Sequence, residues 1–155
     1  MRPLILGFLL FGLAACTPAH LTKLPAPTSE SSELIIYREA AFNAGGAKLV
    51  FGANDSDYAS LWNEQYTKTL IQPGSYKFYV RSTGADQPFI IPITIEPRKR
   101  LCLKAFPNPV NIAKVFFFPA YYFGNTFLLE QVNCLSVTEL SQYSLVEVAY
   151  TSESK

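Results

Sequence analysis

Between residues 34 and 132 the chain repeatedly alternates apolar and polar side chains, and short turn-forming segments separate the alternating stretches. A period of two with β-branched and aromatic residues is typical of strands that bury one face. The intervening segments are rich in glycine, proline, asparagine and aspartate, which favour tight turns. The expected strands are Leu34–Glu39, Lys48–Phe51, Ala59–Trp62, Tyr66–Leu70, Ser75–Arg81, Phe89–Glu96, Leu101–Phe106, Lys114–Phe118 and Thr126–Val132.

This spacing of strands and turns predicts an all-β fold, an antiparallel β-sandwich of about seven to eight strands. Pro92 lies inside one expected strand, and because proline cannot donate a backbone hydrogen bond, we expect that strand at a sheet edge or a bulge. After residue 134 the pattern is ambiguous. Leu140 and Tyr143 have helical spacing, whereas Val146 and Val148 alternate as in a strand.

The N-terminus, residues 1–15, has the layout of a secretory signal peptide. Arg2 provides a positive charge, the run LILGFLLFGL ends at Leu13, and Ala14 and Ala15 are small. A transmembrane helix needs about 20 apolar residues, so this run is too short to span a bilayer. A buried core helix is the alternative, but a run that is apolar on every side and starts at residue 4 favours a signal peptide.

Leu13-Ala14-Ala15-Cys16 resembles the lipobox of bacterial lipoproteins. The resemblance implies that the Cys16 sulfur receives a diacylglycerol, that a signal peptidase cuts before Cys16, and that the new amino group is acylated. Two or three acyl chains would anchor the protein stably, since about two chains suffice. Thr17 stands where an aspartate signals inner-membrane retention in enterobacterial lipoproteins, which implies the outer membrane, facing the periplasm. An ordinary secreted protein that happens to carry Cys16 is the alternative.

Four regions are expected along the chain. They are the signal peptide (1–15), the lipidated cysteine and a flexible tether (16–33), a β-sandwich domain (34–140) and a C-terminal extension (141–155). The tether contains three prolines and lacks apolar periodicity. It also holds the only histidine, His20, so we expect no histidine-based acid–base catalysis in the domain. The formal net charge of +1 argues against nucleic-acid binding.

A family resemblance rests on Tyr37-Arg38, on Ser60-Leu61-Trp62-Asn63 and on Pro73-Gly74-Ser75-Tyr76 leading into a strand. This pattern resembles the bacterial lipoproteins of domain-of-unknown-function family 2846 and, more loosely, PEGA-type domains, both small β-sandwiches. The resemblance covers roughly Leu34 to Val132. The chain departs from the family where Pro97-Arg98-Lys99-Arg100 replaces a glycine-centred turn. Membership implies an envelope lipoprotein of uncharacterised role, with no catalytic residues to carry over.

Cys102 and Cys134 are the thiols that remain once Cys16 is acylated. An exported protein meets an oxidising compartment, where pairing is the default, so we expect a structural disulfide between them. Two buried free thiols or a redox-active pair are the alternatives. A redox pair usually has the close Cys-x-x-Cys spacing, which this chain lacks.

The segment from Phe116 to Phe123 holds six aromatic residues in eight positions. A strand face buries only alternate residues, so some of these rings are expected to point outward unless both sheet faces are covered. Tyr121, Tyr122 and Phe123, next to a glycine turn, are the expected partner contact, because exposed apolar surface often marks an interface. Burial of the whole segment in the core is the alternative.

Two charged segments favour ordinary turns. Pro97-Arg98-Lys99-Arg100 is a basic tip that suits anionic lipid, but three charges also suit a solvated hairpin. Asp55, Asp57 and Glu64 suggest a cation site, yet the segment lacks the glycine and the distal glutamate of a calcium loop, which favours an Asx turn. We therefore expect no metal and no cofactor.

Together these patterns predict a lipid-anchored envelope lipoprotein, a non-enzymatic binding or scaffolding module. Its expected partners are the membrane, through the anchor, and an envelope protein. One alternative is an accessory lipoprotein of an envelope-spanning secretion or assembly complex. The other is an envelope enzyme or inhibitor, which would need a pocket with perturbed acids.

Overall fold

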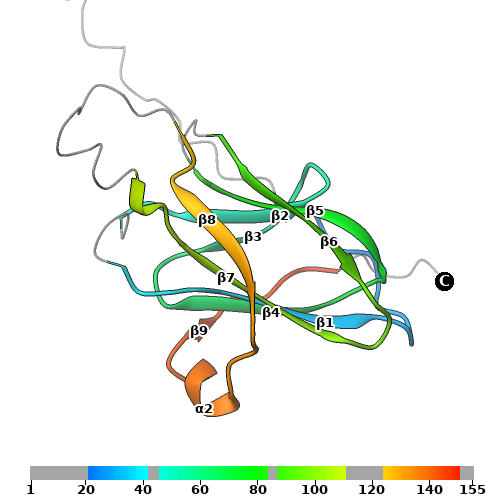
Figure 1. The fold of residues 1–155 in the computed structure, drawn as a ribbon. Coiled ribbons are helices and arrows are strands. Elements are labelled where there is room, and N and C mark those ends of the chain that lie inside the picture. Colours follow the sequence, from blue (N-terminus) through cyan, green and yellow to red (C-terminus); the bar gives the residue numbers. More distant parts are fainter. Residues whose placement is uncertain (1–20, 42–45, 84–86, 111–123, 151–155) are drawn as a thin grey trace, which may run out of the picture.

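A computed structural model of the protein describes residues 21–41, 46–83, 87–110 and 124–150. This part of the chain is mostly strands, in two sheets, with one short helix, so the all-β prediction is confirmed (Figure 1). The elements are β1 (Ser32–Arg38), β2 (Leu49–Ala53), β3 (Ser56–Leu61), β4 (Gln65–Ile71), β5 (Gly74–Ser82), β6 (Phe89–Ile95), β7 (Arg100–Pro107), β8 (Phe127–Val132), α2 (Val137–Leu140) and β9 (Ser144–Leu145).

The two sheets differ in how their strands are ordered. One has five strands in the order β8-β7-β1-β4-β9, and the other has four in the order β3-β2-β5-β6. Within the described residues, every pair of the four-stranded sheet is antiparallel. The five-stranded sheet is mixed, because β1 runs parallel to β7 and β4 runs parallel to β9. The expectation of a purely antiparallel fold is therefore wrong for this sheet.

Alternate residues of the strands point into one hydrophobic cluster, to which both sheets contribute. Its buried members are Leu34, Ile36, Leu49, Phe51, Ala53, Ala59, Leu61, Ile71, Phe78, Val80, Ile95, Leu101, Leu103, Ala105, Phe127 and Leu129. Burying a leucine, isoleucine or phenylalanine side chain contributes about 1.5–3 kcal/mol, so this cluster is the main source of stability. A sandwich remains our prediction for the arrangement of the sheets around it.

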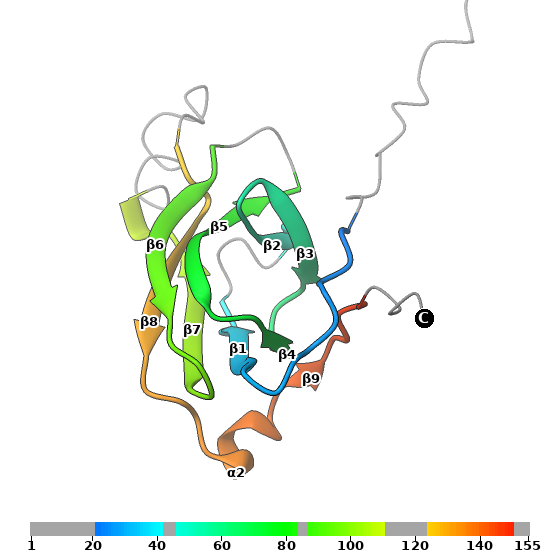
Figure 2. The ribbon, with the colours of Figure 1, turned by 90° about the vertical axis from the view of Figure 1, so that its right-hand side faces the viewer.

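The sequence correctly placed β6 at a sheet edge. Pro92 pairs with Lys77 of β5, and β6 has no partner on its other side within the four-stranded sheet. The missing proline N–H therefore costs no ladder hydrogen bond. The edges of β6 and β8 lie side by side, on the side of the domain opposite the terminal segments (Figure 2).

The expected boundaries at both ends of the domain need correction. Leu24, placed in the tether, is 2% exposed and forms an isolated parallel bridge with Tyr150. The chain is therefore attached to the domain well before residue 34. The C-terminal extension is not separate either. Residues Ser144–Leu145 extend the five-stranded sheet as β9, and Val146 and Val148 pack against the core.

Candidate functional site

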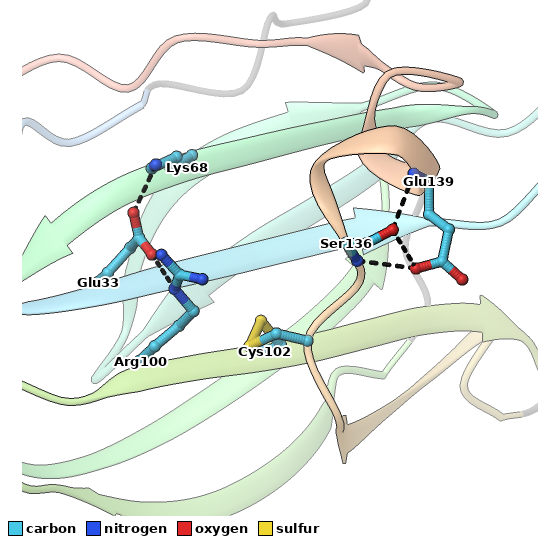
Figure 3. The surroundings of a disulfide bond; sticks show 7 residues. Glu33, Lys68, Arg100, Cys102, Ser136 and Glu139 are labelled. Carbon is cyan, nitrogen blue, oxygen red and sulfur yellow. Dashed lines mark hydrogen bonds and ion pairs between the residues drawn. A yellow bond between two sulfur atoms is a disulfide. The ribbon is translucent and has the colours of Figure 1, made fainter.

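The outer face of the five-stranded sheet is crossed by the C-terminal segment, and a disulfide fastens that segment at its start. Leu101 and Leu103 of β7 point into the core, so Cys102 between them faces outward. Cys134 follows the end of β8, whose Val132 pairs with Cys102. The two sulfurs lie 2.02 Å apart, at bonding distance, as the sequence predicted. The bond joins β7 to the segment that follows the neighbouring strand β8, next to α2 (Figure 3).

A charged cluster lies on the same face (Figure 3). Glu33 of β1 accepts a hydrogen bond from the Arg100 guanidinium and forms an ion pair with Lys68 Nζ, 2.5 Å from Glu33 Oε1. Burial disfavours the charged form of Glu33, but the hydrogen bonds from Lys68 and Arg100 outweigh it and lower its pKa. Glu33 is therefore ionised, and Lys68 and Arg100 balance its charge, which suits a structural role better than proton transfer.

A second group on this face combines aromatic rings with charge. Tyr37 is 5% exposed, and its ring meets the Tyr143 ring edge-on at 5.5 Å between centroids. Burial raises the pKa of both tyrosines. Lys104 Nζ lies 2.8 Å from Glu130 Oε1 and 3.6 Å from Glu39 Oε1. The hydrogen bond with Glu130 raises the pKa of Lys104, so the lysine stays charged at neutral pH. Both tyrosines stay protonated there, because burial raises their pKa values.

Helix α2 belongs to the segment that covers this face. Ser136 caps it: the Ser136 side chain accepts from the Glu139 N–H, and the Glu139 carboxylate accepts from the Ser136 N–H in return (Figure 3). These reciprocal bonds satisfy backbone donors at the helix start. The Ser136 hydroxyl also donates to Glu139 Oε2 at 2.7 Å, and this bond, together with the one from the Ser136 N–H, lowers the pKa of Glu139. None of the helix residues is buried, so α2 is an exposed helical turn, capped at its N-terminus, in the connection between β8 and β9.

The outer face of the four-stranded sheet carries a different polar group. Tyr79 Oη donates to Asp57 Oδ1 at 2.7 Å, and the Arg81 Nη2 lies 2.5 Å from Asp57 Oδ2. Burial and the hydrogen bond to Asp57 raise the pKa of Tyr79. A Cβ on Gly52 would overlap the Tyr79 ring and the Ser56 carbonyl, so glycine is required where this ring crosses β2.

Sequence reasoning missed a fully buried arginine. Arg38 Nη1 donates to the carbonyls of Ala47 at 2.6 Å and Leu61 at 3.1 Å, and the guanidinium lies 4.6 Å from the Phe127 ring centre. Burial lowers its pKa to about 10, so it stays charged at neutral pH. The available signal was the alternation of β1, which places residue 38 on the same inward face as Leu34 and Ile36.

The two charged turns are paired with other segments of the domain. Asn54 has a φ of 48°, which asparagine tolerates in the turn between β2 and β3, and its Oδ1 accepts from the Lys77 N–H of β5. In the basic tip, Arg98 pairs with Glu30 at 3.7 Å and Arg100 with Glu33. Among the described residues, no group of three or more histidine, cysteine or acidic side chains is placed to hold a metal ion.

Several predicted sites lie outside the described residues. These are the signal peptide (1–15), the expected lipidated Cys16, His20, the expected strand Lys114–Phe118 and the expected contact residues Tyr121, Tyr122 and Phe123. They stay predictions from the sequence. Within the described ranges, none of the helical structure is long and apolar enough to cross a membrane.

Comparisons with known proteins leave the chain without a demonstrated family. No model of a known protein family matches it, and neither the curated proteins nor the solved structures contain a significant match. The resemblance to domain-of-unknown-function family 2846 therefore stays a prediction, which rests on the residues that carry it.

Proposed function

We propose that this protein is a bacterial envelope lipoprotein, anchored to the outer membrane through Cys16, whose domain is a non-enzymatic binding or scaffolding module. The observation that carries the proposal is Leu13-Ala14-Ala15-Cys16 at the end of a ten-residue apolar run that begins at Leu4 and includes Leu13. The pair of Cys102 and Cys134 at bonding distance supports export, because disulfides persist in oxidising compartments.

The non-enzymatic part of the proposal rests on the ion pairs of the acidic side chains and on the raised pKa values of the tyrosines. Glu33, Asp57 and Glu130 each pair with a lysine or an arginine. The buried tyrosines have raised pKa values, so they are poor bases and poor nucleophiles at neutral pH. These pairs suit a rigid surface rather than proton transfer.

The partner contact is proposed on the aromatic segment around Tyr121 and Tyr122. Replacing both with serine is expected to weaken capture of an envelope partner, while the unfolding temperature stays within a few degrees of the wild type. The measurement is crosslinking in cells from a photoreactive residue at position 123, in the wild type and in the double variant, with identification of the captured protein. A large drop in thermal stability instead would show that the segment belongs to the core.

Anchoring is tested by Cys16→Ser in the full-length chain, with membrane fractionation and labelling by a fatty-acid analogue. We expect the wild type to be labelled and to sediment with membranes. The serine variant should lose the label and leave the membrane fraction. Cys102→Ser is the matched control, because it removes a cysteine without touching the proposed anchor. Equal labelling of wild type and Cys16→Ser would overturn the proposal.

A further inference from the structure

A backbone clamp fastens the start of the described chain to its end. The Thr22 N–H donates to the Asp57 carbonyl at 2.6 Å, and the Leu24 N–H donates to the Ala149 carbonyl at 2.9 Å. The Leu24 side chain is 2% exposed. Tyr150 completes the clamp, which we define as Thr22–Leu24 with Asp57 of β3 and residues 149–150.

The C-terminal side of the clamp is itself held by β4. The Tyr150 hydroxyl lies 2.6 Å from Thr69 Oγ1 and accepts from the Leu70 N–H at 2.7 Å. Four residues earlier, the Val146 N–H donates to the Tyr66 carbonyl at 2.8 Å. Removing the last residues would therefore take away the bridge partner of Leu24 and leave the single bond from the Thr22 N–H to the Asp57 carbonyl.

The clamp limits how far the domain can move from an anchor at Cys16. Thr22 is six residues from Cys16, and at about 3.3–3.6 Å per residue this stretch spans at most about 22 Å. Without the clamp, the next backbone hydrogen bond to a distant segment that we use as a fixed point is the one that the Glu30 carbonyl accepts from the Arg98 N–H, and the fourteen residues then span at most about 50 Å. The clamp thus shortens the reach by more than half.

Because the clamped tether is short compared with the domain, it also restricts which side of the domain can face the membrane. A domain of about 100 residues has a radius of gyration of about 13 Å, which corresponds to a sphere of about 17 Å radius. Reaching from one pole to the other around this sphere takes about 53 Å, half of its circumference. A clamped tether covers less than half of this path, whereas a released tether covers almost all of it.

We infer that the clamp orients the anchored domain, with the clamp and the start of β3 facing the lipid surface and the edges of β6 and β8 facing away from it. Figure 2 shows the two terminal segments beside β3, opposite β6 and β8. The inference rests on the proposed anchoring at Cys16. It also places the surface that a partner can approach on the β6 and β8 side, where Ile90 is 51% exposed.

The test uses the full-length lipidated protein in vesicles whose headgroups carry a nitroxide quencher. A fluorophore is attached to a single added cysteine, at exposed Asp55 next to the start of β3 or at exposed Gln131 on β8. We expect quenching at position 55 to exceed quenching at position 131 severalfold. Equal quenching in a preparation shown by mass to be acylated would overturn the orientation alone. Failure to bind vesicles, with no acyl group found, would overturn the anchoring and the orientation with it.

Two further variants test whether the clamp is the cause. In a chain that ends at Leu145, the difference between the two labels is expected to shrink to less than twofold, whereas a chain that ends at Tyr150 keeps it. Leu24→Ala, a milder change, is expected to shrink the difference partly. An undiminished difference in Leu24→Ala and in a folded chain ending at Leu145 would contradict the proposed role of the clamp.

Discussion

The two sheets are built in different ways. In the four-stranded sheet, β2 pairs with β3 and β5 pairs with β6, so most pairing is between neighbours in the sequence. In the five-stranded sheet, Glu33 of β1 pairs with Arg100 of β7, and β4 pairs with β9 near the end of the chain. Closing long loops costs conformational entropy. The covalent bond lies in this second sheet, where it joins β7 to the segment after β8.

The largest expected effect comes from removing that bond. Cys102→Ser with Cys134→Ser should lower the free energy of unfolding by about 3–4 kcal/mol, since a link across 32 residues restricts the unfolded chain. Urea unfolding measures the change. Hydrogen exchange should rise first in β7, β8 and β9 and less in β2 and β5. Equal acceleration in both sheets would contradict the contrast between them.

The second largest effect on the free energy of unfolding is expected from loosening the clamp. Leu24→Ala removes a buried side chain and is expected to cost about 2–3 kcal/mol of unfolding free energy. Leu21→Ala is the matched control, because Leu21 is 43% exposed and the same change there should stay within about 0.5 kcal/mol. Equal effects of the two substitutions in urea unfolding would show that Leu24 is not fastened to the domain.

A test of the four-stranded sheet is Gly52→Ala. The new methyl group would overlap the Tyr79 ring and the Ser56 carbonyl, and overpacking of this kind costs about 1–3 kcal/mol. Gly46→Ala has open space around it and is expected to be nearly neutral. Thermal unfolding of both variants checks the prediction. A neutral Gly52→Ala would mean that the ring does not cross β2 closely.

The smallest expected effect concerns the ion pairs of Glu33. Its partners Lys68 and Arg100 have side chains that are 52% and 59% exposed, so Glu33→Gln should cost only about 0.5–1 kcal/mol. Because folding lowers the pKa of Glu33 from its ordinary 4.5, the contribution is fully present above pH 4.5 and is lost as pH falls through the lowered value.

Unfolding measured at pH 7 and again near pH 3 checks this dependence. Glu96→Gln serves as the control, since its contact with Lys99 is 4.0 Å long and exposed on both sides. A Glu33→Gln effect that grows toward low pH would have the wrong sign and would contradict the assignment.

The same contrast explains what the sequence could predict. Alternation located β1 to β8 and the edge position of Pro92, because strand patterning and turn chemistry are local. The parallel pairing of β1 with β7 was missed, since alternation carries no information about strand direction or distant partners. Leu24 was also missed: a single leucine among prolines has no periodicity, and its burial depends on Tyr150 at the other end of the chain.

The central claim is that an exported, disulfide-containing domain is held by a lipid at Cys16. Peptide mass spectrometry of the full-length gene product, purified from membranes without reductant, tests it most directly. We expect a first peptide that starts at Cys16 and carries the mass of a diacylglycerol, together with one linked peptide pair that contains Cys102 and Cys134. An unmodified Cys16 thiol inside a longer N-terminal peptide, with Cys102 and Cys134 both free, would contradict the account.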